Sequence, residues 1–315
     1  GPPAAPTIGT PTALSTTSIR WNFTDNASDE TGFWIHDSSH VVKATCATPD
    51  LTYCDEGGLS VNTQYTRHVH AYNGNGDSTG SAEASAYTLA NVPGVPTVNA
   101  TSTTSLTVII DQNSNPTGPA PADDTKYAIS CDTDTTFLNY TTNACEAIVD
   151  DADHWRTYTN WGGAGGFGDT GLSINTQHIY KAIARNGDNT NTALSSGSLK
   201  YTLANAPGVP TVNATSATSL TVIIDQNSNP AGTTYAIACD AAGTTWLSAD
   251  GASCGAEVWQ DYATWGGAAG KTHTGLSVNT QYTYKVKARN GNNVQTALSS
   301  GISKYTLANV PGAPT

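Results

Sequence analysis

One serine and two histidines are the first residues of this chain whose types and spacing could do chemistry. Residues 76–80 have the Gly-x-Ser-x-Gly spacing of a serine nucleophile, and His68 and His70 precede them. That chemistry needs a strand, a sharp turn and a helix behind the serine. Ser78 instead lies among Asn, Gly and Asp, which are ordinary loop residues. The sequence therefore predicts a plain loop here and no catalytic residue.

The two histidines could begin a metal site. Residues two apart on a strand point to the same side, and imidazole is a common metal ligand. A third ligand is not evident in the sequence. The equivalent outward positions near the end of the chain hold Lys285, Lys287 and Arg289. We therefore predict a solvated polar face at His68 and His70, without a metal.

Two acidic-polar loops offer a second candidate for a cation. Residues 111–116 and 225–230 both read Asp-Gln-Asn-Ser-Asn-Pro. Calcium takes many oxygen ligands, and carboxylates dominate among them. One carboxylate among amides is too few, so no metal and no other cofactor is predicted.

The cysteines fall two to each third of the chain and at short spacing. They are Cys46 and Cys54, Cys131 and Cys145, and Cys239 and Cys254. Several pairings are formally open, but one local pair in each third predicts three disulfides, each closing a short hairpin. Metal binding is the alternative, and no Cys-x-x-Cys or nearby histidine pair supports it. Disulfides persist outside the cytosol.

Tryptophans supply the candidate contact residues. Residues 155–163 recur as residues 259–267, and each copy carries two tryptophans: Trp155 and Trp161, then Trp259 and Trp265. Aromatic rings can stack on sugars, so a glycan-binding face is one reading. The other is that one tryptophan of each pair completes the core, since large aromatics usually carry buried area. Trp34, on the outward face of its strand, is a further candidate contact for a glycan or protein partner.

Five asparagines stand in Asn-x-Ser/Thr sequences, the acceptor pattern for glycosylation. They are Asn22, Asn26, Asn99, Asn139 and Asn213. The pattern also arises by chance in a chain rich in Asn and Thr. Asn99 and Asn213 occupy equivalent positions in two repeats, so one outcome is expected for both.

Composition limits the classes of function. Charged residues make up only 12%, and the formal net charge is −12 at pH 7. Phosphate binding needs a basic surface, so a nucleic-acid partner is excluded. No apolar run is long enough for a membrane span. The chain also contains no methionine, which indicates a segment of a longer array or a processed precursor. This composition is typical of an extracellular β-rich protein.

The elements that must position all these residues repeat three times. Residues 58–65, 171–178 and 275–282 share the pattern Gly-Leu-Ser-Val/Ile-Asn-Thr-Gln followed by an aromatic. Each copy runs into an alternating segment, which predicts a half-buried strand, and that strand ends in Asn-Gly. We expect the Asn-Gly pair to supply the positive φ angles of a tight hairpin turn.

This stretch resembles the start of strand F in fibronectin type III domains. In that family the tyrosine hydroxyl bonds back to the backbone, which forms the tyrosine corner. Tyr65 and Tyr282 match that position, whereas the middle copy has His178. Trp21, in the alternating segment Ile19-Arg20-Trp21-Asn22-Phe23, matches the core tryptophan of strand B. The resemblance implies an all-β chain of three tandem fibronectin-III-like sandwiches.

The repeats are expected at residues 1–91, 92–205 and 206–315. Residues 93–118 align without gaps on residues 207–232 and differ only at Thr103/Ala217 and Thr117/Ala231. Such near-identity favours a role that scales with repeat number. Short linkers with two prolines and one glycine predict stiff spacers. Strands of this length give about 30 Å per domain, so three in line predict a rod of about 100 Å.

The function predicted from the sequence is structural. We expect a non-catalytic segment of an extracellular or cell-surface filament, stalk or adhesin, which associates with itself or with other surface proteins. Self-association is expected near residues 87–96, 201–210 and 305–315, because an exposed strand edge is a template for strand addition. The alternative is the spacer or glycan-binding region of a secreted polysaccharide-degrading enzyme.

Overall fold

The structure is a computed structural model, and it describes residues 1–117 and 125–313. The expectation of an all-β chain is confirmed. Only three single-turn 3-10 segments interrupt the strands of the described residues: η1 (Thr159–Trp161), η2 (Gly163–Gly165) and η3 (Gly267–Ala269). No helix in this part of the chain has the length and apolarity that a membrane crossing requires.

The described strands divide among the three repeats in chain order. The first repeat contains β1 (Thr7–Ile8), β2 (Thr12–Ser15), β3 (Ser18–Thr24), β4 (Gly32–His36), β5 (Val42–Cys46), β6 (Tyr53–Gly57), β7 (Gln64–Asn73), β8 (Gly76–Asp77) and β9 (Ala84–Tyr87). The second contains β10 (Gly94–Ala100), β11 (Ser105–Asp111), β12 (Lys126–Cys131), β13 (Thr136–Leu138), β14 (Cys145–Ala147), β15 (Arg156–Thr157), β16 (Phe167–Thr170), β17 (Gln177–Arg185) and β18 (Ser198–Tyr201). The third contains β19 (Thr211–Ser216), β20 (Ser219–Ile223), β21 (Thr234–Ala238), β22 (Trp246–Leu247), β23 (Cys254–Gly255), β24 (Gln260–Asp261), β25 (Lys271–His273), β26 (Gln281–Arg289) and β27 (Ile302–Tyr305).

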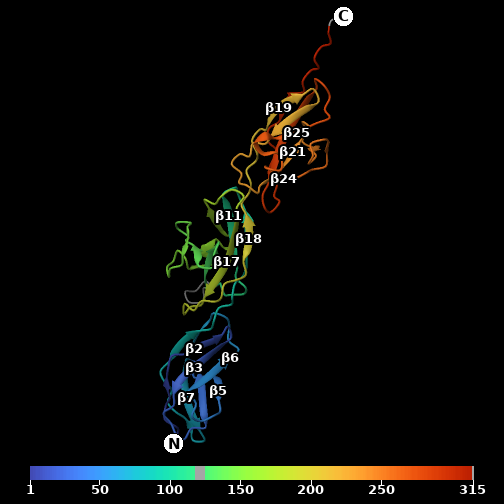
Figure 1. The fold of residues 1–315 in the computed structure, drawn as a ribbon. Helices are drawn as coiled ribbons and strands as arrows, with labels where there is room; N and C mark the ends of the chain where they lie inside the picture. Colours follow the sequence, from blue (N-terminus) through green and yellow to red (C-terminus); the bar gives the residue numbers. More distant parts are fainter. Residues whose placement is uncertain (118–124, 314–315) are drawn as a thin grey trace. The chain divides into compact units, whose positions relative to one another are not determined.

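Two antiparallel sheets make up the first repeat (Figure 1). One has the order β1-β3-β2 with β6 also paired to β3, and the other has the order β5-β4-β7-β8 with β9 paired to β7. In the letters of the fibronectin type III fold, these are sheets A-B-E and C′-C-F-G. Period-2 alternation requires this arrangement, because each strand has one apolar face to bury.

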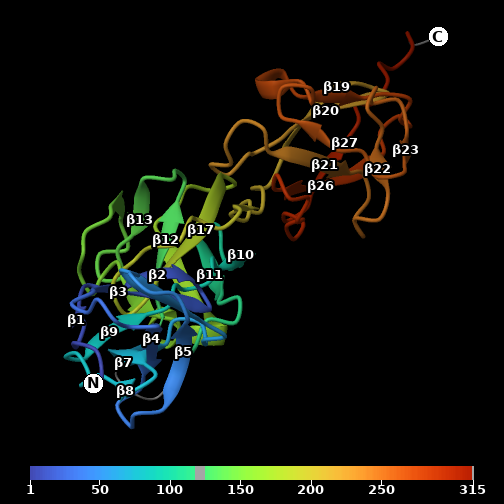
Figure 2. The same cartoon turned by 90° about the horizontal axis from the view of Figure 1, so that it is seen from below.

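The later repeats keep the same plan. The third has a sheet β19-β20-β25 and a sheet β23-β22-β21-β26-β27; β25 is labelled in Figure 1 and the other strands in Figure 2. The second has the orders β10-β11-β16 and β14-β13-β12-β17-β18. The fold class predicted from the alternating segments is therefore that of fibronectin-III-like sandwiches.

The chain divides into two compact units along a different line from the repeats. The first consists of Gly1–Thr97, Val108–Phe167 and Ile179–Ser198, and the second of Val98–Thr107, Gly168–His178 and Leu199–Thr315. The dividing line passes through the second repeat. Every junction contact described below lies within one unit. The repeat boundaries at residues 91/92 and 205/206 stay a prediction.

The cores follow the predicted alternation. Ile19, Trp21 and Phe23 on β3 are buried, as are Phe33 and Ile35 on β4. In the third repeat Leu220, Val222 and Ile224 of the β20 segment pack with Tyr235 and Ile237 of β21. The apolar side chains at these positions therefore face the core, as one apolar face per strand requires.

A buried ion pair joins the two sheets of the first repeat. The Glu56 carboxylate on β6 accepts hydrogen bonds from Arg67 Nη2 at 2.7 Å and from Trp21 Nε1 at 2.9 Å. Both charged side chains are buried. Because the carboxylate is paired and also accepts the indole N–H, the usual penalty for an isolated buried charge is offset. Trp21 is thereby fixed in orientation as well as buried.

The Asn-Gly pairs do not make the turn that the sequence suggested. The residues with positive φ in these hairpins are Gly76, Asn189 and Asn293, and none of the Asn-Gly residues is among them. That prediction is wrong: the residue with positive φ lies three positions after the asparagine in each hairpin. The reason for Asn-Gly is found at the junctions between repeats.

Candidate functional site

The junction between the first two repeats is built around Asn62. This side chain is fully buried, and its Nδ2 donates to Thr125 Oγ1 at 2.8 Å. Its Oδ1 accepts from Gly187 N at 2.9 Å. Asn186 Nδ2 donates in the opposite direction, to the Thr88 carbonyl at 3.1 Å. One amide from each repeat therefore satisfies a backbone group of the other, as buried polar groups require.

A tyrosine completes this junction. Tyr87 N donates to Asp188 Oδ2 at 2.7 Å, and the Tyr87 ring lies directly on Gly187. A Cβ at Gly187 would come within 2.4 Å of the ring. Glycine is required here because of this close approach between repeats.

The junction between the second and third repeats copies the first, contact by contact. Asn175 Nδ2 donates to Thr233 Oγ1 at 2.8 Å, and Asn175 Oδ1 accepts from Gly291 N at 2.9 Å. The reciprocal bond runs from Asn290 Nδ2 to the Thr202 carbonyl at 2.9 Å. Tyr201 N donates to Asn292 Oδ1 at 2.7 Å, and its ring lies on Gly291. The same set of contacts is therefore used at both junctions.

The acidic-polar loops hold the linkers through asparagine side chains. Asn115 Oδ1 accepts from Asn91 N at 2.7 Å, and Asn115 Nδ2 returns a bond to the Asn91 carbonyl at 2.8 Å. The same reciprocal pair joins Asn205 and Asn229. The loop carboxylate Asp111 accepts from Asn113 N within the loop. The polar side chains of these loops are thus used to fix the chain where it enters each repeat.

The third copy of the junction residues lies open. Asn279 matches Asn62 and Asn175 and has the same left-handed backbone, with φ values of 48°, 41° and 43°. Asn279 is exposed, and its side-chain amide has no hydrogen-bond partner among the described residues. Tyr305, the counterpart of Tyr87 at 5% exposure, is 54% exposed. We call Asn279, Tyr305 and Thr306 the tail face.

The matching surface on the first repeat is also exposed. Thr31 corresponds to Thr125 and is exposed, whereas Thr125 is buried. Gly74 corresponds to Gly187, and a Cβ built on it meets nothing within 4 Å. Asn73 Nδ2 donates to the Gly1 carbonyl at 3.2 Å, where its counterpart Asn186 uses Thr88. We call Thr31, Asn73, Gly74 and Asn75 the head face.

A histidine cluster occupies the outer face of β4 and β7 in the first repeat. His36 lies opposite His68 in the strand register, and His70 follows two residues later on the same side. His40, in the turn after β4, places Nδ1 3.3 Å from His68 Nε2. One ring nitrogen from each of the four lies within 4.8 Å of the others. Two further imidazoles, of His36 and His40, therefore join the pair that the sequence revealed.

The predicted solvated face at His68 and His70 is wrong. His36, His68 and His70 are only 4–5% exposed, and only His40 is open to solvent. The rings shield one another, with centroids 4.4 Å apart for His36 and His70 and 4.9 Å for His68 and His70. Cross-strand register is what gathers them, because β4 supplies one side of the cluster and β7 the other.

The three disulfides join the predicted pairs of cysteines. They are Cys46–Cys54, Cys131–Cys145 and Cys239–Cys254. The second and third each span three neighbouring strands of one sheet, β12-β13-β14 and β21-β22-β23, and not the single short hairpin that was expected. The first joins different sheets, because Cys46 lies on β5 and Cys54 on β6. It links the two sheets of the sandwich instead of closing a hairpin within one.

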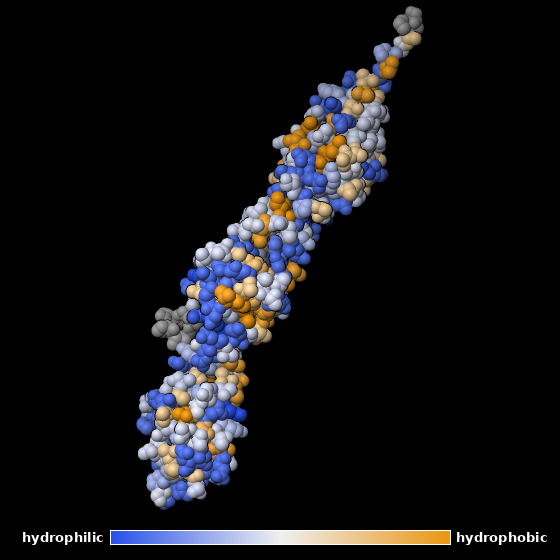
Figure 3. All heavy atoms as spheres, turned by 60° about the vertical axis from the view of Figure 1, so that its left-hand side comes forward, coloured by the Kyte–Doolittle hydropathy of each residue, from blue (hydrophilic) through white to orange (hydrophobic). Residues whose placement is uncertain are grey.

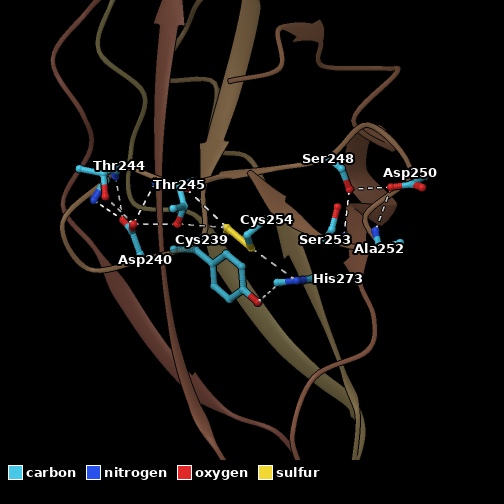
Figure 4. Close-up of a disulfide and its surroundings, with 12 residues drawn as sticks. Cys239, Asp240, Thr244, Thr245, Ser248, Asp250, Ala252, Ser253, Cys254 and His273 are labelled. Atoms are coloured by element: carbon cyan, nitrogen blue, oxygen red, sulfur yellow. Dashed lines mark hydrogen bonds between the residues drawn. A yellow bond between two sulfur atoms is a disulfide. The ribbon is translucent and has the colours of Figure 1, made fainter. Parts of the chain in front are cut away.

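Polar groups surround the disulfide of the third repeat (Figure 4). His273 Nε2 lies 3.6 Å from Cys254 Sγ, and His273 Nδ1 is 2.8 Å from the Tyr284 hydroxyl. Burial lowers the pKa of His273 and raises that of Tyr284. Both groups are therefore uncharged near neutral pH.

The tyrosine corners form where the resemblance placed them. Tyr65 OH accepts from Ser60 N at 2.9 Å, and Tyr282 OH accepts from Ser277 N at 2.9 Å. Both bonds close the turn that precedes strand F. His178 holds this position in the second repeat.

One tryptophan of each recurring pair completes a core, which confirms the second reading. Trp161 and Trp265 are 1% exposed, and their indole Nε1 atoms donate to the Tyr127 and Tyr235 carbonyls at 2.8 Å. The larger cores that lack a strand-B tryptophan thus regain one from a loop.

The other tryptophans are covered on one side by a neighbour. Arg185 lies over Trp155 at 4.4 Å, and Arg289 over Trp259 at 4.6 Å. Trp34 stacks on Tyr72 with centroids 4.3 Å apart. A sugar would reach only the remaining edge or face of these rings. Glycan contact at these tryptophans stays a prediction.

The Asn-x-Ser/Thr asparagines differ in accessibility. Asn139 is buried, and its Nδ2 donates to Glu146 Oε1 at 2.7 Å. Asn22 and Asn26 each donate to a backbone carbonyl, at 2.7 and 2.8 Å. Asn99 and Asn213 are exposed on equivalent strands. Glycosylation stays a prediction, and the last two sites have the amides best placed for it.

The loop around Ser78 has the plain structure that was predicted. Ser78 is buried, accepts from Ala71 N at 3.0 Å and donates to the Thr79 carbonyl at 2.9 Å. Its own carbonyl accepts from His70 Nδ1 at 2.7 Å. The serine hydroxyl is thus used within its loop.

The surface drawn in Figure 3 shows hydrophobic residues scattered among hydrophilic ones. Exposed apolar side chains include Leu199 at 56% and Leu307 at 48%. Scattered apolar residues are normal on a soluble surface. The polar junction faces are therefore the surfaces of this chain with the clearest built chemistry.

Comparison with known proteins adds little beyond the fold. No protein-family model matches the chain, and no curated protein sequence matches it. Among solved structures, the chain is similar to the crystal structure of chicken CNTN1 FN1-FN3 domains, at 16% identity and a TM-score of 0.29, over 98% of this chain and 100% of that one. The assignment rests on strand order and on the tyrosine corners. The repeats of this chain are fibronectin-type-III-like β-sandwiches.

Proposed function

We propose that this protein is a non-catalytic structural segment of an extracellular filament, stalk or surface adhesin. In this proposal, its tail face docks on the head face of a second copy and repeats the junction found twice inside the chain. The observation that carries the proposal is the duplication of that junction, with matching residues left uncovered on the first and third repeats.

The uncovered residues are complementary in chemistry. The tail face offers the Asn279 amide, the Tyr305 ring and N–H, and the Thr306 carbonyl. The head face offers the Thr31 hydroxyl, the Gly74 N–H and the Asn73 amide. Each internal junction uses these same groups in the same pairs. A contact that joins two different faces of one molecule is heterologous, so it extends into an open chain of subunits unless the rotation closes it into a ring.

The first residue of the chain marks the site that docking would use. Asn73 Nδ2 and Asn75 Nδ2 both reach the Gly1 carbonyl, at 3.2 and 3.4 Å. In the internal junctions, Thr88 and Thr202 supply the carbonyl to the corresponding asparagine. Asn73 Nδ2 also lies 3.2 Å from the Asp29 carbonyl and 3.3 Å from Asp29 Oδ2. Docking would therefore replace these partners and the exposed Gly1 carbonyl with the Thr306 carbonyl. The expected self-association around residues 305–315 belongs here, although Pro314 and Thr315 lie outside the described residues.

The chemistry of the chain supports an extracellular place. Three disulfides persist where glutathione does not reduce them. The few charged side chains and the reciprocal amide pairs suit a surface exposed to varied salt, because hydrogen bonds between neutral groups are screened less than ion pairs. The enzyme-spacer alternative has weaker support, since its tryptophan contacts are largely covered.

A glycine substitution tests the docking directly. Gly74→Val adds a side chain where the present structure has open space, so folding should be unchanged. In a docked pair it would strike the Tyr305 ring, as a Cβ at Gly187 would strike Tyr87. The matched control is Gly57→Val, because Gly57 is also open and lies off the head face.

Sedimentation velocity over a concentration series, followed by negative-stain microscopy, would report the assembly. The wild type and Gly57→Val should form end-to-end chains as concentration rises, and Gly74→Val should remain a monomer. A wild type that stays monomeric throughout the series, or assembly by Gly74→Val at the wild-type concentration, would overturn the docking proposal.

A further inference from the structure

We propose that His36, His40, His68 and His70 form a binding site for one divalent transition-metal ion, with zinc the ion that fits the donor set. Four imidazoles from two adjacent strands and one turn converge on a common point, with one nitrogen of each within 4.8 Å of the others. The site belongs to the first repeat alone and is separate from the junction faces.

The spacing of the donor nitrogens matches tetrahedral zinc. Zinc–nitrogen bonds of about 2.0 Å place the ligand nitrogens about 3.3 Å apart along a tetrahedral edge. His68 Nε2 and His40 Nδ1 are 3.3 Å apart. The four donor nitrogens as a set lie within 4.8 Å of one another, so binding of one zinc ion would draw the rings closer together.

Hydrogen bonding leaves the right nitrogens for an ion. His70 Nδ1 donates its proton to the Ser78 carbonyl at 2.7 Å, which places the lone pair on Nε2. Asp77 Oδ2 lies 3.6 Å from the same Nδ1. A carbonyl or carboxylate behind a histidine is the usual outer partner of a metal ligand, because it fixes the tautomer and raises the basicity of the ring.

Buried nitrogens without partners point to a missing ligand. His70 Nε2 and both ring nitrogens of His36 are buried, and they have no hydrogen-bond partner among the described residues. A buried polar atom left unpaired costs free energy. A cation at the centre of the cluster would take the lone pair of His70 Nε2 and that of the unprotonated His36 nitrogen.

The type of donor also limits which ion would bind. Neutral imidazole is the form that binds metal. An all-imidazole set selects zinc, copper or nickel over calcium and magnesium, which prefer oxygen.

The other repeats show what the site requires. The position of His68 holds Lys181 and Lys285 in the later repeats, and that of His70 holds Ile183 and Lys287. In the first repeat Gly80 leaves room for two of the histidine rings: a Cβ at Gly80 would come within 2.8 Å of the His68 ring and 2.9 Å of His70 Nε2. The third repeat therefore supplies a natural template for removing the site.

The test uses the whole chain, produced without a histidine tag and stripped with a chelator. Titration calorimetry with zinc chloride should give one ion per chain, and magnesium chloride should give no heat of binding. X-ray absorption on the zinc-loaded chain should show nitrogen scatterers at about 2.0 Å with imidazole outer-shell features. Zinc should also raise the unfolding midpoint, because an ion bound only by the folded state stabilises it.

Three variants decide which residues bind the ion. His68→Lys copies the third repeat, and His40→Ala removes the exposed ligand without creating a cavity; each should weaken zinc binding at least about 10-fold. His178→Gln, far along the sequence, is the matched control and should bind as the wild type does. Circular dichroism and the metal-free unfolding midpoint establish that each variant is folded. Absence of stoichiometric zinc binding by the wild type, or equal binding by the His40→Ala/His68→Lys double variant, would overturn the proposal.

Discussion

The ring of Tyr87 occupies the space in which Gly187 would carry a side chain. A Cβ built on Gly187 lies 2.4 Å from the ring, and Tyr201 stands in the same relation to Gly291. Two residues about a hundred positions apart in sequence are thus matched in size. The recurring Asn-Gly is explained by this contact: asparagine supplies the amide that crosses the junction, and glycine supplies room for the tyrosine.

Gly187→Ala should loosen the first junction. Overpacking of this kind costs about 1–3 kcal/mol, and Gly74→Ala should cost almost nothing because its surroundings are open. Urea unfolding compares the two variants, and limited proteolysis of the linker at residues 88–97 reports the junction itself. Equal sensitivity of both variants would mean that the glycine is needed by its own hairpin and not by Tyr87.

The tyrosine corners give a second prediction. Tyr65→Phe and Tyr282→Phe each remove the acceptor of one backbone N–H, at Ser60 and Ser277. Loss of one such hydrogen bond costs about 0.5–1.5 kcal/mol. His178→Tyr, which installs the missing corner, should be neutral or stabilising. Denaturant midpoints unchanged by both phenylalanine variants would show that the hydroxyls contribute nothing to stability.

Local pattern was enough to predict the strands and their buried faces. Ile19, Trp21 and Phe23 alternate with polar residues, and a sheet with one wet face leaves them a single side to bury. The cysteine pairs were also predictable, because the two cysteines of each pair are closer in sequence to each other than to any other cysteine. The tyrosine corners came from the family resemblance and not from the pattern.

The histidine cluster was beyond the sequence because it depends on register between strands. His36 and His68 are about thirty residues apart in sequence, and only the pairing of β4 with β7 brings them face to face. The comparison with Lys285 and Lys287 led to the wrong prediction of a solvated face, because it assumed that equivalent positions in different repeats have equivalent surroundings. No sequence pattern indicated that the turn carrying His40 would bring this residue to the cluster.

Asp240 gives a prediction about pH. Its carboxylate accepts from Thr245 Oγ1 at 2.7 Å and from Thr244 Oγ1 at 2.8 Å, and backbone N–H groups of the same turn add to these. The hydrogen bond from Thr245 is the largest cause that holds the pKa of this carboxyl well below its usual range. A pKa lowered by folding contributes stability above the unfolded value of about 3.9.

That contribution should disappear as the pH falls toward the folded pKa. The urea midpoint of Asp240→Asn should therefore lie below that of the wild type at pH 7, and the difference should shrink steadily below about pH 4. Thr245→Val is a second variant with the same expected trend. A difference that is as large at pH 2 as at pH 7 would assign the effect to packing and not to the charge.

The last prediction compares asparagines that share a backbone conformation and differ in their surroundings. Asn62, Asn175 and Asn279 all have left-handed φ angles between 41° and 48°, so replacement by alanine carries a similar backbone cost at each. Asn62 and Asn175 also lose two hydrogen bonds across a junction, whereas Asn279 has none to lose in a single chain. Asn62→Ala and Asn175→Ala should each cost about 1–3 kcal/mol more than Asn279→Ala, since partners are left buried and unpaired. The measurement is urea unfolding at low protein concentration, where chains do not dock. At high concentration Asn279→Ala should instead reduce end-to-end assembly. The same loss of stability for all three at low concentration would show that the amide acts within its own repeat, and the junction would then owe its order to the tyrosine contact alone.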